Sequence, residues 1–327
     1  MIKKWNSLYA LVLPVLMVLP ASLDAQGGYA GAFLRMGIAS RSEAMGRAYT
    51  AVTGDPEGAY YNPAAATTAE GRTVDLSVRS MALDRSFAYA GFATQIRPSS
   101  DEPDGETAPL NGGLAVSLIY ASTANIEGRD FDGVQFGSYE NMELSMNITF
   151  ALKLHDKVAV GGTGHIIANR FPGLGNEGQN MTTRSVGIDV GVLLTPMPGV
   201  WLGGVYKNIN ARYTWDSNPL YQRGTSTVDD FPKIWRLGVA TTRLYKGLTL
   251  SADIEGSRKY EPRFFFGAAW QAMPQISLRA GLRDGVPTFG ADYAFTWGSR
   301  VATIYYAFAN NDLALAGTHV FTWSFRF

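Results

Sequence analysis

The 327-residue sequence contains no cysteine, which excludes a disulfide framework and any thiolate metal site. Lys plus Arg and Asp plus Glu number 28 each, so no excess of positive charge indicates a nucleic-acid partner. The histidines His155, His165 and His319 show neither metal-ligand spacing nor a neighbouring nucleophile motif. We therefore expect a protein that is not an enzyme and that carries no cofactor or metal.

Long apolar runs are also missing beyond the N-terminus. Lys3 and Lys4 precede an apolar stretch from Leu8 to Leu19, and Ala25 offers a small residue before Gln26. This order is typical of a secretory signal peptide, and the stretch is too short to span a membrane comfortably as a helix. We therefore expect residues 1–25 to be removed from the mature protein, and we expect no transmembrane helix after them.

Most of the chain instead consists of alternating apolar and polar residues. The sequence has 36 glycines, 12% aromatic residues and a mean hydropathy of −0.03. From Arg72 onward apolar and polar residues alternate with a period of two, which sends them to opposite faces of a strand. About fourteen strand-length segments are expected, of which the weakest lie at 87–96 and 201–211, and the clearest at 142–153, 186–192, 248–255 and 276–283.

The connections between these segments are short and long in turn. Short turns are expected near 155–157, 195–198, 245–247, 273–275 and 298–299, and longer polar loops at 124–140, 170–181, 214–232, 257–262 and 309–317. Outer-membrane barrels have short periplasmic turns and longer outside loops, whereas a soluble β-sandwich has no reason to keep this rhythm. The acidic stretch 98–111 is a long exception on the periplasmic side. The pattern predicts an all-β transmembrane antiparallel barrel.

The last strand supports this prediction. Phe321, Trp323, Phe325 and Phe327 alternate with polar residues, so one face is entirely aromatic. In a soluble sandwich that face would be core, whereas in a barrel it would meet lipid. A terminal strand that ends in Phe resembles the assembly signal of bacterial outer-membrane proteins, which places the protein in the cell outer membrane.

The inward face is expected to carry charges of both signs. A pore that selects ions more naturally shows one dominant sign. A mixed set either pairs with an inserted segment or lines a solvated interior, and the sequence leaves both alternatives open. The expected lumen charges are Asp189, Arg236, Asp253, Glu255, Arg279 and Arg283, together with Asp75, Arg79, Glu143, Lys153, Asp292 and Arg326.

Residues 26–70 do not alternate and precede the barrel of residues 71–327. Ser40 or Ser42 is expected to cap a short helix that ends at Gly46. Asp55-Pro56 and Asn62-Pro63 are turn signals. An ordinary helix–loop leader would account for these features, but their order also resembles a known family. Ala44-Met45-Gly46-Arg47-Ala48-Tyr49, an Asp-containing turn and Asn62-Pro63-Ala64 resemble the N-terminal signature of FadL-like outer-membrane proteins, in particular the PorV/PorQ branch.

The resemblance implies a fourteen-stranded barrel whose N-terminal segment, residues 26–70, forms a hatch in the lumen. The hatch motif would comprise Met45, Gly46, Arg47, Asp55, Asn62, Pro63 and Ala64. The sequence departs from the family at Gly54, where paired acids are frequent, and at Ala65, where Gly is frequent.

The resemblance also implies three possible functions. PorV-like members serve type IX protein secretion by docking or shuttling proteins, which is the first hypothesis. The alternative is a FadL-like channel for hydrophobic small molecules such as fatty acids, and the third is a purely structural barrel. The partners would be outer-membrane lipid, secretion-system or exported proteins, or a hydrophobic ligand. Such a ligand would enter past Phe171, Pro172 and Leu174, or past Trp215, Pro219, Leu220 and Tyr221; those apolar residues would otherwise only pack the loops together.

Overall fold

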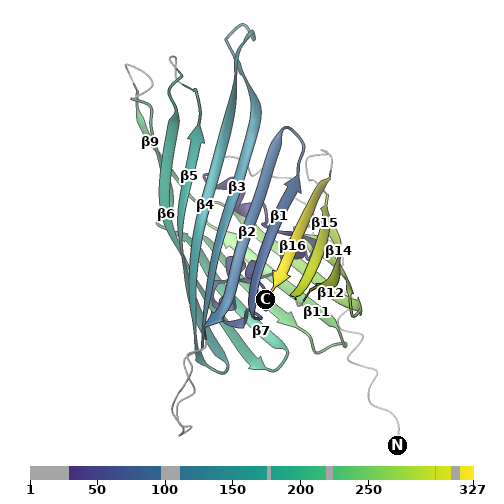
Figure 1. Cartoon of the computed structure of the whole chain (residues 1–327). Helices are drawn as coiled ribbons and strands as arrows, with labels where there is room; N and C mark the ends of the chain where they lie inside the picture. Colours follow the sequence, from purple (N-terminus) through teal and green to yellow (C-terminus); the bar gives the residue numbers. More distant parts are fainter. Residues whose placement is uncertain (1–28, 97–110, 175–177, 219–223, 299, 311–316) are drawn as a thin grey trace, which may run out of the picture.

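A computed structural model describes residues 29–96, 111–174, 178–218, 224–298, 300–310 and 317–327. Fourteen strands form a closed antiparallel barrel in which the first strand, β1, pairs with the last, β16 (Figure 1). This confirms the predicted fold class. The barrel strands are β1 (Arg72–Ser80), β2 (Arg85–Ile96), β3 (Asn111–Arg129), β4 (Gln135–His155), β5 (Val158–Phe171), β6 (Met181–Met197), β7 (Val200–Ile209), β10 (Ile234–Thr241), β11 (Leu248–Ser257), β12 (Tyr260–Met273), β13 (Ile276–Arg283), β14 (Val286–Trp297), β15 (Arg300–Ala309) and β16 (Thr318–Arg326).

The outer surface of the barrel is apolar and the inner surface polar, as expected for a barrel in lipid. On β4, Leu144 and Ile148 are 40% and 50% exposed, whereas their neighbours Ser145 and Asn147 are buried inside. The segments with mixed faces are also strands, β2 and β7. Their pattern is mixed because inward apolar residues such as Phe87 and Tyr89 join the interior cluster instead of facing water. Among the described residues, no helix is both long and apolar enough to cross a membrane.

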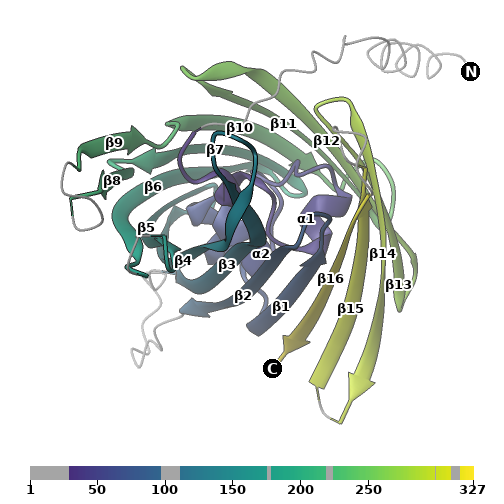
Figure 2. The same ribbon diagram turned by 90° about the horizontal axis from the view of Figure 1, so that it is seen from above.

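Four short helices lie inside the barrel, as the view from above shows (Figure 2). They are η2 (Ala32–Arg35), α1 (Ser40–Ala44), α2 (Pro56–Tyr61) and η3 (Pro63–Thr68). We call residues 29–69 the hatch. The residues expected at 1–25 as a signal peptide lie outside the described residues.

The Asp-Pro and Asn-Pro pairs begin helices and do not form isolated turns. The Asp55 Oδ1 atom accepts a hydrogen bond from Gly58 N at 2.8 Å, and Asn62 Oδ1 accepts one from Ala64 N at 3.1 Å. In each pair the proline occupies the first helical turn, where its missing N–H costs nothing. The expected caps at Ser40 and Ser42 are wrong. Ala39 is the N-cap of α1 without a side-chain bond, and the Ser40 hydroxyl instead donates to Val320 O at 3.0 Å.

The wall of the barrel is tall on one side and low on the other (Figure 1). β3 and β4 have 19 and 21 residues, whereas β13 has 8. The polar stretch 124–140 is therefore mostly strand and not loop. Its alternation is lost because the extended hairpin rises beyond the apolar belt, where neither face has to be apolar. Similarly, 214–232 contains a separate two-stranded sheet, β8 (Arg212–Asp216) and β9 (Ser226–Asp230), and 257–262 holds only a tight turn.

The apolar belt generates the first prediction. Replacing Ile148 with Arg places a charge on the lipid side near the middle of β4 and should lower the free energy of unfolding by about 2–4 kcal/mol. Ile126→Arg, on β3 near the hairpin tip, is the matched control and should cost about 1 kcal/mol or less. Urea unfolding in lipid vesicles measures both. Equal losses in the two variants would contradict a membrane-facing belt.

Candidate functional site

The hatch is seated directly on the backbone of the barrel wall. A side chain at Gly161 of β5 would meet Ala64 N at 2.6 Å, and one at Gly267 of β12 would meet Met45 O at 2.6 Å. Glycine is needed at these places because any Cβ would collide with the hatch backbone. Sequence reasoning treated glycine only as a compositional signal, although its inward positions could have revealed this seat. The other glycines whose Cβ positions would meet the hatch are Gly113, Gly191, Gly203, Gly238, Gly281 and Gly290.

Arg41 of α1 is the centre of the first cluster of buried charges. Its Nε donates to Glu57 Oε1 at 3.0 Å, its Nη1 lies 3.6 Å from Asp55 Oδ2, and its Nη2 contacts Asp75 of β1. Glu57 also accepts a hydrogen bond from the backbone N–H of Ser42 at 2.8 Å. The Arg41 guanidinium therefore links α1 and α2 to strand β1 of the barrel wall.

Glu43 is the centre of the second cluster. Its carboxylate receives Arg47 Nε at 3.0 Å, Arg79 Nη2 at 2.9 Å and Arg283 Nη1 at 2.6 Å. Burial alone would raise the pKa of Glu43, but the three guanidinium groups outweigh it and hold the pKa below its usual range. Arg47, in the left-handed region with φ 65°, also donates to Arg35 O at 2.7 Å. The cluster thus joins α1 and the segment before it to β1 and β13.

Asp253 of β11 and Asp189 of β6 hold the far side of the hatch. Asp253 Oδ2 accepts from Tyr49 N and Thr50 N, each at 2.9 Å. Asp189 lies 3.5 Å from Lys207 Nζ, which donates to the backbone oxygen of Tyr60 at 2.9 Å. These carboxylates therefore contact the hatch directly or through one lysine.

Most of the remaining expected lumen charges pair within the wall or at its rim, whereas Glu143 accepts a hydrogen bond from Asn169 at 3.3 Å and forms no ion pair. Arg236 Nε lies 3.3 Å from Glu255 and 3.8 Å from Asp253. Arg279 contacts Asp292 of the neighbouring strand β14. Lys153 and Arg326 lie at the periplasmic rim and pair with Asp156 and Glu70. Of the two alternatives left open by the sequence, the structure shows a paired interior.

The predicted hatch motif is spread along the seat. Met45 and Gly46 pack on β12 and β13, and Pro63 and Ala64 pack on Gly161. The Asn62 side chain donates to Thr50 O at 2.9 Å and to Val192 O at 3.0 Å, so it ties the hatch to itself and to β6. The predicted assembly-signal residues Phe321, Trp323, Phe325 and Phe327 lie at the C-terminal end, where Phe321, Trp323 and Phe325 pair with β1 and Phe321, Trp323 and Phe327 are exposed on the outer surface.

A cluster of aromatic rings packs next to the hatch, with Phe33, Tyr213 and Phe231 buried and Phe171 and Trp215 half-buried. The ring of Phe171 at the end of β5 lies 5.8 Å from that of Trp215, Trp215 lies 5.5 Å from Tyr213, and Tyr213 lies 4.8 Å from Phe231. Phe33 of the hatch belongs to the same apolar cluster. We call Phe33, Phe171, Tyr213, Trp215 and Phe231 the aromatic vestibule.

Strand β8 holds two of the vestibule rings in place. The Ser185 hydroxyl accepts from Arg212 N at 2.9 Å, and the Thr183 hydroxyl accepts from Thr214 N at 3.1 Å, so polar side chains of β6 bind the backbone of β8. The sequence indicated apolar entry residues at Phe171 and Trp215 but missed Phe33, Tyr213 and Phe231, which lie in no alternating barrel strand. Pro219, Leu220 and Tyr221 lie outside the described residues, and Pro172 and Leu174 follow β5.

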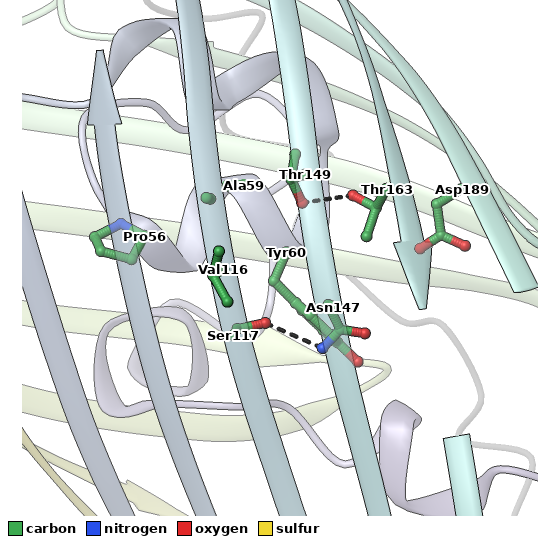
Figure 3. Close-up of a pocket in the computed structure, with 10 residues that line it drawn as sticks. Pro56, Ala59, Tyr60, Val116, Ser117, Asn147, Thr149, Thr163 and Asp189 are labelled. Carbon is green, nitrogen blue, oxygen red and sulfur yellow. Dashed lines mark hydrogen bonds between the residues drawn. The ribbon is translucent and has the colours of Figure 1, made fainter. Parts of the chain in front are cut away.

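A small cavity with a mixed lining lies between α2 and the tall wall (Figure 3). Tyr60 and Ala59 line it on the hatch side. Hydrogen bonds from Asn147 to Ser117 at 3.0 Å and between Thr149 and Thr163 at 2.7 Å line it on the wall side. The cavity is too small for a hydrocarbon, so the vestibule is the better candidate for ligand contact.

No catalytic or metal centre is evident in the described part of the chain. No group of three or more His, Cys, Asp or Glu residues there could hold a metal ion. His165 Nδ1 lies 3.8 Å from Asp189, His155 ends β4 and accepts from Lys157 N at 3.2 Å, and His319 bonds Tyr306 on the outer surface at 2.8 Å. None of the three contacts a serine that could serve as a nucleophile.

The seat generates a second prediction. Gly161→Leu should displace the hatch, because overpacking costs about 1–3 kcal/mol and the backbone of Ala64 cannot yield. Trypsin should then cleave after the buried Arg41 and Arg47 about tenfold faster or more in detergent-solubilised protein. Gly164→Leu on the same strand is the control, because nothing lies within 4 Å of its Cβ position and it faces outward. Equal rates of trypsin cleavage in the two variants would contradict the close contact between Gly161 and the hatch backbone.

The Glu43 cluster generates a third prediction. Glu43→Gln removes the charge that three guanidinium groups share and should weaken hatch docking by about 3 kcal/mol. Because the pKa is lowered on docking, the stabilisation is present above the usual carboxyl pKa near 4.3 and is lost as the pH falls below it. Hydrogen exchange of residues 40–48 should therefore rise below about pH 4 in the wild type and be high at all pH values in Glu43→Gln. If the protection of residues 40–48 in the wild type did not change with pH, the role of the Glu43 charge in docking the hatch would be contradicted.

No family model and no curated relative matches the chain. Solved structures do. The Ralstonia pickettii toluene transporter TbuX is 14% identical with a TM-score of 0.57, covering 89% of this chain and 98% of its own. The Pseudomonas putida toluene transporter TodX is 14% identical with a TM-score of 0.56, covering 88% and 96%. A Pseudomonas aeruginosa FadL homologue is 13% identical with a TM-score of 0.54, covering 88% and 97%. The chain therefore has the fold of the FadL-type outer-membrane transporters.

Proposed function

We propose that this protein is an outer-membrane channel through which small hydrophobic molecules enter. The observation that carries the proposal is the aromatic vestibule, because a water-filled pore would line its lumen with polar side chains. Phe171 and Trp215 are half-buried, so an apolar ligand can contact the exposed part of each ring. Ligand sites are typically such apolar recesses with a few polar groups.

The fold comparisons support this function more than they support protein secretion. TbuX and TodX are described as toluene transporters, and they share the fold of this chain. A channel of this fold would accept hydrocarbons of similar size or the acyl chains of fatty acids. The hatch closes the part of the lumen below the vestibule, so the ligand would first collect on the aromatic rings.

Uptake of labelled toluene and of a labelled long-chain fatty acid by cells that produce the protein tests this function. We expect faster uptake than in cells without it, and a several-fold loss in the Tyr213→Ala/Trp215→Ala double variant, because two rings leave the vestibule. Tyr245→Ala, in the short exposed turn between β10 and β11, is the control and should transport normally. Uptake no faster than in cells that lack the protein would refute the proposal.

A second candidate is a docking or shuttle component of type IX secretion, as in the PorV/PorQ branch. It is favoured by the tip of the β3–β4 hairpin, where Phe131 is 110% exposed and Val134 and Phe136 are also exposed. Apolar side chains gathered at a tip in water are typical of a protein contact. The filled lumen also suits a protein that presents its outer loops.

A photo-crosslinker at Phe131 in intact cells tests this second candidate. Crosslinks to a secretion component or an exported protein would support it. A crosslinker at Tyr245, on the periplasmic side, is the matched control and should capture neither. Capture of nothing at either position would argue against a docking role, and a deletion that weakens only the envelope would favour a purely structural barrel.

A further inference from the structure

Two exposed arginines interrupt the apolar outer face of the barrel on its tall side, where β5 and β6 stand (Figure 1). They are Arg170 near the end of β5 and Arg184 near the start of β6. Their neighbours Asn169 and Thr183 are buried inside, so strand alternation turns both arginines away from the lumen. Every other outward residue of these two strands is uncharged. The cost of an outward charge in a membrane barrel depends on its depth, so the depth of the two arginines decides what they can do.

Both arginines lie at the outer edge of the apolar belt. The uncharged outward positions run from Val158 to Ala168 on β5 and from Val186 to Leu194 on β6, and an arginine follows or precedes each run directly. A tilted strand needs about 9–11 residues to cross the hydrocarbon of a bilayer, which these runs provide. The guanidinium groups therefore lie at the level of the lipid head groups, on the side of the longer outer loops.

The register of the sheet brings the two arginines together. Arg170 lies directly opposite Thr182, and Arg184 lies directly opposite Ala168, so the arginines are diagonal neighbours on one face. Diagonal neighbours in a sheet are about 7–8 Å apart, which long side chains can bridge. Among the described residues, no carboxylate forms an ion pair with either arginine. Two guanidinium groups thus converge on one exposed spot without an anion.

Glu140 of β4 is the acid on the adjoining outward positions. It lies two residues before Met142, which is directly opposite Arg170, and it is half-buried. It forms no ion pair with Arg170 or Arg184. One carboxylate beside two guanidinium groups leaves an excess of positive charge on this part of the outer face.

We infer that Arg170 and Arg184 bind a phosphate group on the head of a lipid in the outer leaflet of the membrane. Each guanidinium can donate two parallel N–H groups to phosphate oxygens, a geometry that lysine cannot offer. The acyl chains of the same lipid would lie on the belt below, where Ile166 and Val186 pair directly and are 57% and 61% exposed. The inference requires that the barrel lies in the outer membrane, but it does not depend on the proposed uptake of ligands.

The apolar surface below the arginines favours a lipid over a soluble anion. A free phosphate or an acidic peptide would gain only the attraction of exposed charges, which is weak and is screened by salt. A lipid whose chains already cover Ile166 and Val186 holds its phosphate beside the arginines at a high effective concentration. The charge and the belt therefore act on the two ends of one molecule.

Native mass spectrometry of the mature protein, released from phosphatidylcholine nanodiscs that contain some lipid A, tests the inference. The probes are lipid A with its phosphates and the same lipid A after enzymatic removal of the phosphates, and the readout is the ratio of the two that the protein retains. The wild type should retain the phosphorylated form preferentially. Arg170→Gln or Arg184→Gln should lower the ratio about fivefold, and the double variant about twentyfold, because a basic residue near a lipid surface contributes about 1 kcal/mol.

The matched control is Arg243→Gln/Lys246→Gln, which removes two exposed positive charges from the periplasmic turn between β10 and β11. This variant should keep the wild-type ratio. Glu140→Gln removes a charge of the opposite sign from the same outer face and should not lower the ratio. Each result is a ratio within one variant, so partial misfolding does not mimic it.

Three results would overturn the inference. The first is equal retention of both forms of lipid A by the wild type, which would show contact with the acyl chains only. The second is an unchanged ratio in Arg170→Gln/Arg184→Gln. The third is an equal loss in Arg243→Gln/Lys246→Gln, which would show a general effect of net charge. None of these results bears on hydrocarbon uptake, and a failure of uptake would leave the lipid site standing.

Discussion

Closure of the sheet between β1 and β16 is the constraint on which the rest of the structure depends. Within a bilayer no water is available to bond free backbone groups, so a sheet can cross only when it has no open edge. The register that joins Val74 to Phe325 and Val78 to Phe321 provides that closure. Once the sheet is closed, strand alternation directs hydrocarbon to the lipid and leaves polar and charged side chains to be satisfied inside the lumen.

Many of those interior charges form ion pairs or hydrogen bonds with the hatch. Arg41 and Glu43, two residues apart on one short helix, present a cation to Asp75 and an anion to Arg79 and Arg283 of the wall. The helix itself has only five residues and would not be stable alone. Its conformation is therefore imposed by the wall, through ion pairs at its ends and glycines beneath its backbone, and hatch and barrel are best regarded as one folding unit.

The barrel could be predicted from the sequence because each strand carries its own signal. Residues such as Leu144 and Ser145 reveal their faces through their nearest neighbours alone. The vestibule could not be predicted in this way, because Tyr213 lies within, and Phe231 directly after, a small sheet whose position is fixed by Ser185 and Thr183 of another strand. The glycine seat was only partly readable. Strand alternation distinguishes the inward Gly161 from the outward Gly164, but the three-dimensional contacts are needed to show that the hatch backbone lies against Gly161.

The lumen contains two regions that are held together in different ways. Where Arg41, Glu43 and Asp253 are paired, moving the hatch would expose several buried charges at once, so this region is a fixed floor. The aromatic vestibule is held by ring contacts and not by ion pairs, so an apolar ligand that enters it has to displace rings and not charges.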